Sequence, residues 1–328
     1  MINRKFLSFK STVDLEFILN RQFSNAAILP LENGPLSGTV GVVRLPNISL
    51  NIVNVNRPIA IYADRSLDKI FFSVDLSHAS NLPSSGLKAQ GVSINTPALF
   101  GFNSNLKDLD LRLNSGSQLA TIVLQKEFLE SKLVALGLDH LLEFLGKYNI
   151  FSSLSIQTCL LDLMAKVWLG DGLLFDTSSL FEDHILATLI DSLSDGDNRR
   201  VARVPSRQER HEAALKVLSI TSQFPAKGLE IQDLSRILHQ SRTSLFNGCK
   251  EQFSMSPIQV IRSVRMHQVR HALLDVEFCE QHNLSGVIDV AQHFGFVGRS
   301  HFARFYKQEF CETPRETLQT RRLAEKSF

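Results

Sequence analysis

The sequence predicts a multidomain α+β protein, with a β-rich barrel or sandwich and a helical layer in residues 1–195 and an all-α domain in residues 208–328. Three observations predict this fold. Short β-rich runs fill residues 28–124, leucine-rich helical periodicity follows in residues 126–193, and the last third of the chain contains one helical unit twice. A chain of 328 residues is long enough for two domains that each bury a core.

The β-rich region is predicted from period-two alternation. NISLNIVNVN alternates through Ile48, Leu50 and Ile52, while KIFFSVDL and QLATIVL are short runs rich in β-branched and aromatic residues. Pro, Gly and Asn separate these runs. Many short strands within about 100 residues are typical of a small barrel or sandwich.

Helical periodicity predicts three helices next, over residues 126–146, 154–169 and 179–193. One face of the first carries six leucines: Leu129, Leu133, Leu136, Leu141, Leu142 and Leu145. These leucines either pack on the β-rich region or form part of a dimer surface, and the sequence leaves both readings open.

Residues 196–207 are predicted to be an interdomain linker, because the segment SDGDNRRVARVPSR (residues 194–207) is polar and lacks apolar periodicity. The balance of basic and acidic residues differs between the two sides of this linker. Residues 1–195 hold 15 Lys and Arg against 19 Asp and Glu, whereas residues 196–328 hold 20 against 14. A basic final third attached to a slightly acidic remainder is typical of a nucleic-acid-binding module.

Other classes of protein find little support in the sequence. The apolar runs are far shorter than the ~20 residues of a membrane span, and the N-terminus lacks a secretory signal, so we expect a cytoplasmic protein without membrane contact. The four cysteines are scattered and are expected to be reduced thiols. No catalytic residue, metal site or cofactor is predicted, since the chain lacks a G-x-S-x-G elbow, a P-loop and a histidine cluster.

The duplicated unit lies in residues 234–257 and 290–314, LSRILHQSRTSLFNGCKEQFSMSP and VAQHFGFVGRSHFARFYKQEFCETP. Aligning Ser241 with Gly298 needs no gap as far as the closing prolines. Each unit is predicted to be two short helices joined by a tight turn, the arrangement that places a second helix in the major groove of DNA.

The second helix of each unit has an apolar stripe and a polar face. Ser241 is expected to cap residues 242–253, and the stripes are Leu245, Cys249 and Phe253, then Phe302, Tyr306 and Phe310. The first helix presents Thr243, Phe246, Asn247 and Lys250 outward, and the second presents Arg299, Ser300, Ala303, Arg304 and Lys307. Arg and Asn can read base edges and Phe can contact a thymine methyl group. Lys250 and Lys307, nearer the helix ends, are expected to contact phosphates.

Between the units, PIQVIRSVRMHQVRHALL (residues 257–274) is predicted to be one helix that begins at Pro257. Eighteen residues span about 27 Å, somewhat less than the ~34 Å of one turn of DNA, so some bending of the DNA is expected. His267 and His271 have metal-ligand spacing, but we expect them on a DNA-facing or solvated face.

The constellation Val290, Ala291, Gly295, Phe296, Ser300, Phe302, Arg304, Tyr306, Lys307, Phe310 and Pro314 resembles the signature of the AraC/XylS family of bacterial transcription regulators. The resemblance covers residues 207–322. It implies seven helices, of which the third and sixth enter the major groove, and base-reading positions at Arg242, Thr243, Phe246, Asn247, Arg299, Ser300, Ala303 and Arg304. This chain departs from the family at Cys311, where glycine is usual, and at Asn247 and Gly248, which suggest a less charged and less rigid first reading helix.

The first half is more loosely similar to the cupin-like, effector-binding and dimerising domain of this family. The resemblance implies a DNA-binding regulator whose partners are double-stranded DNA, RNA polymerase and a small-molecule effector of unknown identity, with a possible homodimer. An activator is expected. The alternatives are a repressor or a co-regulator of the same fold that binds RNA or protein, and an enzyme fused to a DNA-binding module.

Overall fold

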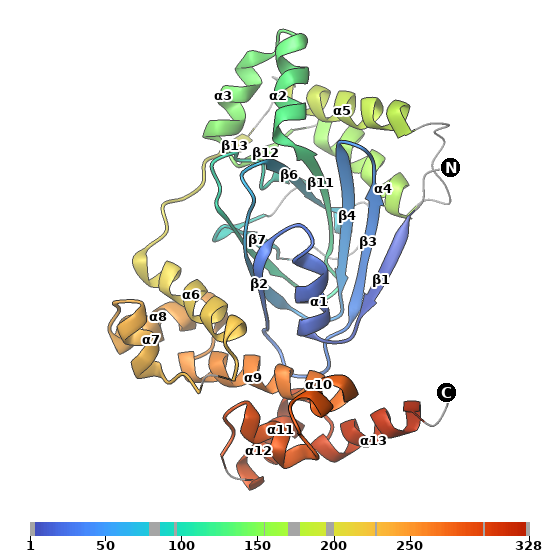
Figure 1. The fold of residues 1–328 in the computed structure, drawn as a ribbon. Helices are drawn as coiled ribbons and strands as arrows, with labels where there is room; N and C mark the ends of the chain where they lie inside the picture. Colours follow the sequence, from blue (N-terminus) through green and yellow to red (C-terminus); the bar gives the residue numbers. More distant parts are fainter. Residues whose placement is uncertain are drawn as a thin grey trace.

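The structure is a computed structural model that describes residues 4–78, 86–94, 97–153, 155–169, 178–194, 200–226, 228–297 and 299–325. Strands dominate its first part, and residues 209–325 are helical (Figure 1). The predicted fold class is confirmed.

Two antiparallel sheets form the β-rich part. The larger sheet has the order β1 (Lys5–Phe9), β3 (Gly38–Arg44), β4 (Ile48–Val55), β11 (Gln118–Gln125), β6 (Lys69–Asp75), β9 (Leu99–Phe100), β12 (Ile150–Ser152) and β13 (Arg200–Ala202). The smaller sheet has the order β2 (Ser24–Pro30), β5 (Ile59–Asp64), β10 (Asp108–Leu113), β7 (Lys88–Ala89) and β8 (Val92–Ser93).

The alternation of β4 shows how these sheets are buried. Ile48, Leu50 and Ile52 pack in a core shared with the helical layer, whereas Val53 and Val55 pack in the core between the two sheets. Since successive side chains of a strand point to opposite faces, β4 is apolar on both. The larger sheet is therefore the middle layer of this domain.

The helical layer consists of α2 (Lys126–Ala135), α3 (Asp139–Lys147), the π-helix Ile156–Leu160, α4 (Leu161–Leu169) and α5 (Ser178–Ser194). Leu129, Leu133, Leu141 and Leu145 are buried against the larger sheet, so these four leucines form an intrachain core. The prediction of one helix over residues 126–146 is wrong. Gly137 takes a positive φ of 67° and separates α2 from α3, which leaves Leu136 59% exposed.

Two further elements differ from the sequence-based expectation. The β-rich part begins before residue 28, with β1, α1 (Thr12–Leu19) and β2. Residues 200–202, inside the predicted linker, form β13 and pair with β12. A three-residue strand is too short to show a period-two pattern, so β13 could not be predicted from the sequence.

The C-terminal part contains α6 (Glu209–Gln223), α7 (Ile231–Ile237), α8 (Arg242–Phe253), α9 (Pro257–Leu274), α10 (Val276–Gln281), α11 (Val287–His293), α12 (Arg299–Phe310) and α13 (Pro314–Glu325). These are eight helices within the described residues, where the resemblance implied seven. Figure 1 shows α9 running between two groups, α6–α8 at one end and α10–α13 at the other. Each end of α9 contributes to a separate apolar core.

The helical part packs against the smaller sheet. Ala27 and Leu29 of β2 and Ala60 and Tyr62 of β5 share one apolar core with residues of α6, α8 and α9. At the same junction, the Glu16 carboxylate of α1 accepts hydrogen bonds from the Ile28 N–H and the Ser222 hydroxyl of α6, both at 2.9 Å. Burial raises the pKa of Glu16 to about 7, although both hydrogen bonds act in the opposite direction.

Glu16 should make the stability of the protein depend on pH. Its pKa is higher in the folded chain than its ordinary value of 4.5, so the stability it contributes is lost as pH rises from about 4.5 to 7. We expect Glu16→Gln, which keeps the acceptor oxygen, to melt increasingly above the wild type between pH 5 and pH 7.5. Thermal unfolding across this range measures the difference. Glu32→Gln, at an exposed position, is the control, and parallel curves for Glu16→Gln and wild type would contradict the prediction.

Candidate nucleic-acid interface

The two reading helices, α8 and α12, bury the predicted stripes. Leu245, Cys249 and Phe253 of α8 are at most 2% exposed, and Phe302, Tyr306 and Phe310 of α12 are at most 6% exposed. Ser241 caps α8 as predicted, because its hydroxyl accepts the Ser244 N–H at 3.1 Å. The local periodicity of each helix therefore fixed which face is turned inward.

The opposite faces are exposed to solvent. On α8 these residues are Arg242, Thr243, Phe246, Asn247 and Lys250; on α12 they are Ala303, Arg304 and Lys307. Phe246 is 47% exposed, and the Lys250 ammonium lies 6.0 Å from the centre of its ring. The side chains of Arg299 and Ser300 lie outside the described residues. The side chains that are described leave both reading faces accessible to a duplex.

The backbone repeats as well as the sequence. The turn inside each unit contains a left-handed residue, His239 (φ 51°) in the first and Gly295 (φ 80°) in the second. Each reading helix also ends in one, Ser254 and Cys311, both with φ 59°. Cys311 thus adopts the conformation for which glycine is favoured at this place, at a cost of about 1 kcal/mol. The departure at Cys311 does not alter the shape of the helix end.

Gly248 has a packing role that the sequence did not reveal. It is buried, and a Cβ built at this position would lie 2.1 Å from the Arg210 carbonyl oxygen of α6. The glycine therefore allows α6 to approach the backbone of α8. The expectation that it makes the helix less rigid is replaced by a requirement for close helix packing.

The linking helix α9 begins and ends where the sequence predicts. Pro257 stands at its first turn, and Ser256 and Gln259 form a reciprocal capping box. The expectation for His267 is wrong, because this residue is 3% exposed and its Nε2 lies 3.3 Å from the Glu309 carboxylate of α12. Its ring also packs edge-on against Phe310, 4.8 Å between centres. His267 therefore helps to join α12 to α9.

α9 also contacts the β-rich part. Arg270 donates to the Lys10 carbonyl oxygen at 3.2 Å, and half-buried His271 lies 3.8 Å from the Asp14 carboxylate. The Gly34 N–H donates to the Glu309 carbonyl oxygen. These contacts hold the C-terminal helical part against the first half of the chain without covering the exposed faces of α8 and α12.

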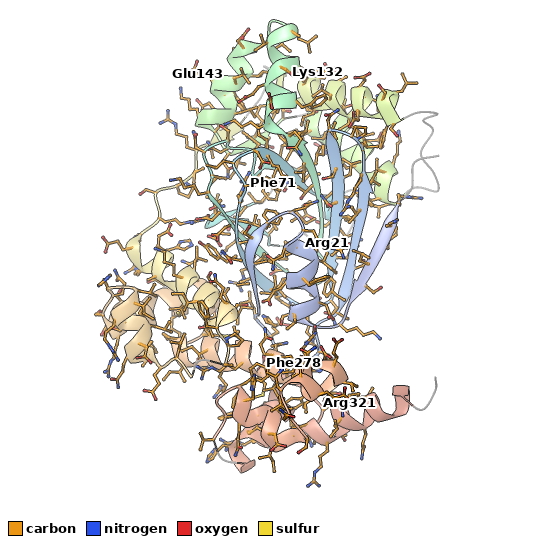
Figure 2. The ribbon with its side chains drawn as sticks, viewed as in Figure 1. Arg21, Phe71, Lys132, Glu143, Phe278 and Arg321 are labelled. Atoms are coloured by element: carbon orange, nitrogen blue, oxygen red, sulfur yellow. The ribbon has the colours of Figure 1, made fainter. Side chains whose placement is uncertain are left out.

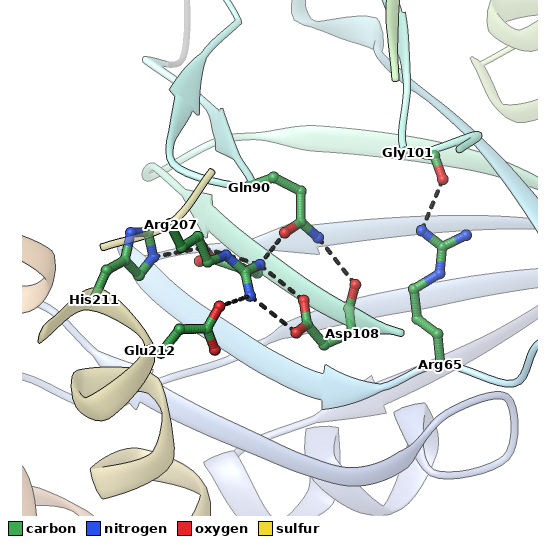
Figure 3. Close-up of polar contacts among 8 residues, drawn as sticks. Arg65, Gln90, Gly101, Asp108, Arg207, His211 and Glu212 are labelled. Atoms are coloured by element: carbon green, nitrogen blue, oxygen red, sulfur yellow. Dashed lines mark hydrogen bonds and ion pairs between the residues drawn. The ribbon is translucent and has the colours of Figure 1, made fainter. Parts of the chain in front are cut away.

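Arg207, just before α6, forms a charged cluster with the smaller sheet (Figure 3). Its guanidinium donates to both carboxylate oxygens of Asp108, at 2.8 and 2.9 Å, to Glu212 at 3.1 Å and to the side-chain oxygen of Gln90. His211 lies 2.9 Å from Asp110. Burial opposes the charge of Arg207, but the bond to Asp108 and the nearby carboxylates outweigh it and raise the pKa above its ordinary value.

We call Arg207, His211, Glu212, Gln90, Asp108 and Asp110 the interdomain cluster. No sequence signal indicated it, since its members come from three distant segments.

A cavity lies between the two sheets beside α1, and two members of the interdomain cluster, Gln90 and Asp110, belong to its lining. The same side chains therefore face both the cavity and the helical part. The lining also includes Ile18 and Phe23, which belong to α1 and the turn after it.

Other site types are not formed by the residues that the structure describes. Within them, no three His, Cys, Asp or Glu side chains are grouped so that they could hold a metal ion. All four cysteines are free, and burial raises the pKa of Cys249 to about 12. None of the described helices is long and apolar enough to cross a membrane.

Comparison with known proteins gives matches in the helical part. Residues 234–320 match the family described as "Helix-turn-helix domain". The chain is 32% identical over 90 residues to the regulatory protein HrpB of Ralstonia nicotianae, and 30% identical over 81 residues to the transcriptional activator RhaS of Escherichia coli O157:H7. These matches cover 27% and 25% of this chain and span 18% and 27% of the relatives.

A solved structure resembles a larger part of the chain. The crystal structure of the AraC-like transcriptional activator CuxR aligns over 82% of this chain and 96% of its own, with 12% identity and a TM-score of 0.40.

Proposed function

We propose that the chain is a sequence-specific, ligand-responsive transcription regulator of the AraC/XylS family. The match of residues 234–320 to a helix-turn-helix family and the similarity to the activator RhaS support this proposal. The chain binds duplex DNA by inserting α8 and α12 into successive segments of the major groove. The observation that carries the proposal is the duplicated unit, whose two reading helices expose polar and basic side chains at both ends of α9.

The exposed residues are assigned two roles. Base edges are read by Arg242, Thr243, Phe246 and Asn247 of α8 and by Arg299, Ser300, Ala303 and Arg304 of α12. Lys250 and Lys307, nearer the ends of their helices, bind phosphates and fix the register of the protein on the duplex. The division of the chain that we propose has an effector and dimerisation domain in residues 1–195, a linker in residues 196–207 and a DNA-binding domain in residues 208–328. Within the linker, residues 200–202 are anchored to the larger sheet as β13.

Arg304→Ala is expected to weaken specific binding by about 1–3 kcal/mol and to relax base preference in one half-site, because a guanidinium contact to a base edge is lost. Fluorescence anisotropy with a duplex selected from a random pool, and with single-base variants of it, measures both effects. Unchanged affinity together with unchanged preference would contradict the role of Arg304.

Lys307→Ala is expected to lower affinity evenly across sequences, because a phosphate contact carries no base information. The slope of log affinity against log salt should flatten by about one unit. A salt titration of the same set of duplexes tests this, and an effect confined to one base position would speak against a phosphate role. Since Lys307 and Arg304 are one turn apart on α12, each variant is a control for the other.

Responsiveness to a ligand is supported by the shared position of Gln90 and Asp110. Both line the cavity and both bond to residues that lead into α6, Gln90 to Arg207 and Asp110 to His211. A molecule that displaced either side chain would change the contacts that hold the helical part. We propose this route for the effector, and DNA affinity with and without a bound molecule tests it.

We propose RNA polymerase as a partner from the resemblance to the AraC/XylS family, and a homodimer from exposed apolar side chains of the helical layer. RNA polymerase is the expected target of activation in the cytoplasm, and a homodimer would use the helical layer, where Val134 and Leu136 are more than half exposed. Sedimentation equilibrium of the full chain measures the oligomeric state. Transcription from a template that carries the selected site distinguishes an activator from a repressor. A co-regulator that binds RNA or protein would show no salt-dependent affinity for duplex DNA.

A further inference from the structure

The cavity between the sheets is mainly apolar. It has about 970 Å³ of empty space, counted with the part that opens to solvent, which sets an upper bound on the room for a ligand. Aliphatic and aromatic side chains form most of the wall, among them Val53, Ile61, Phe71, Phe100 and Leu119. Such a wall suits a molecule with an apolar body.

One buried cation interrupts this wall. Arg65 follows β5 and is 8% exposed. It donates to the Gly101 carbonyl oxygen at 2.8 Å, and its guanidinium carbon lies 4.6 Å from the centre of the Phe71 ring. Its Nε has no hydrogen-bond partner. Figure 3 shows the guanidinium of Arg65 facing Gly101 and well separated from the interdomain cluster.

Among the residues that the structure describes, Arg65 has no carboxylate within ion-pair distance and therefore lacks a counter-ion. Burial lowers the pKa of Arg65 to about 10, with Asp108 acting in the opposite direction, so the side chain remains charged at neutral pH. A buried charge without a partner is unfavourable in general, and an anion in the cavity would relieve this.

The other charged residues of the cavity lining do not supply a counter-ion to Arg65. Asp110 is the one carboxylate among the lining residues described, and it already pairs with His211 and Arg207. Two more arginines of the lining, Arg21 and Arg44, are exposed. Figure 2 shows Arg21 beside α1 and Phe71 deeper within the β-rich part. Exposed cations around an apolar cavity raise the local concentration of anions.

We propose that this cavity binds a monocarboxylate with an apolar body, and that Arg65 binds the carboxylate. The inference rests on the proposed ligand-responsive function and specifies the chemical class of its effector. A guanidinium matches the planar carboxylate with two parallel hydrogen bonds, and its weak hydration suits a site with little water. One buried guanidinium balances one negative charge, which favours a carboxylate over a phosphate dianion.

Three ten-carbon probes test the chemical class with the full-length wild-type chain. Isothermal titration calorimetry below the micelle concentration compares decanoate, 1-decanol and decyltrimethylammonium. We expect decanoate to bind at least about tenfold more tightly than decanol, as one charge-assisted contact would give, and the ammonium to bind more weakly than either. Equal affinity for decanoate and decanol, or no binding of decanoate, would overturn the proposal.

Variants test the residue. Arg65→Gln should lower decanoate affinity about tenfold and leave decanol affinity unchanged, whereas Arg65→Lys should retain part of the preference for the carboxylate. Arg112→Gln, in β10 beside lining residues but outside the lining, is the matched control and should behave as wild type. A folded Arg65→Gln protein that keeps the full preference would exclude Arg65. If Arg65→Gln does not fold, the relative affinities of the three probes for the wild-type chain test the proposal.

Duplex binding by the same wild-type preparation separates the two proposals. Selective DNA binding without carboxylate preference would overturn the ligand class alone. Carboxylate preference without selective DNA binding would overturn the regulator and leave the site in place.

Discussion

Gly248→Ala is expected to destabilise the DNA-binding part by about 2–3 kcal/mol, the upper range for overpacking. The added methyl group would lie 2.1 Å from the Arg210 carbonyl oxygen and 3.5 Å from the Ala214 methyl group. The nearer of these two atoms, the Arg210 carbonyl oxygen, belongs to the backbone. It cannot move away as the end of a flexible side chain can. α6 or α8 must therefore shift, and α8 carries one of the two sets of residues that we propose to read bases.

Urea unfolding followed by circular dichroism measures this effect, and anisotropy with the selected duplex measures its consequence for binding. Gly146→Ala is the control, since Gly146 also lies within a helix, α3, but its Cβ would meet atoms no closer than 3.9 Å. That variant should be as stable as wild type or slightly more so, because alanine favours helix. If Gly248→Ala unfolds at the same urea concentration as wild type, the close approach of α6 to α8 is not as described.

Arg207→Met is expected to lower stability by about 3 kcal/mol, because it leaves the partly buried carboxylates of Asp108 and Asp110 without their main cation. The Arg207 side chain is 8% exposed and those of the two aspartates are 19% and 15% exposed. Methionine keeps most of the apolar stem and removes the charge. The loss should fall on the junction between the smaller sheet and α6, so the two parts of the chain should unfold less cooperatively.

Differential scanning calorimetry tests this directly. Arg203→Met, an exposed position four residues earlier in the same segment, is the control and should leave the transition unchanged. Adding Asp108→Asn to Arg207→Met should restore part of the lost stability, because it removes the unpaired negative charge. A single unshifted transition for Arg207→Met would contradict the role given to the interdomain cluster.

The elements that sequence analysis predicted well are those specified by neighbouring residues. The stripe Phe302, Tyr306 and Phe310 recurs every four residues, and Pro257 follows a capping serine, so α8, α9 and α12 are encoded locally. The residues whose burial was predicted wrongly from the sequence depend on contacts between distant parts of the chain. The sequence predicted that His267 is exposed, but in the fold its side chain is buried against Glu309 and Phe310.

The candidate effector site shows the same limit. Arg65 stands between an aspartate and a serine in a polar turn, and nothing near it in sequence indicates that its side chain is buried. Its environment comes from Gly101 and Phe71, which are distant in sequence. The interdomain cluster is likewise assembled from residues 90, 108–110 and 207–212, so an unaligned single sequence cannot reveal it.

In the function that we propose, α9 holds α8 and α12 so that they read adjacent stretches of one duplex. Hydroxyl-radical footprinting of the full-length chain on its selected duplex measures this most directly. We expect two protected segments on one face of the duplex, separated by about 10 base pairs, with Arg304→Ala weakening protection of one segment first. A single protected segment, or two on opposite faces of the duplex, would contradict it.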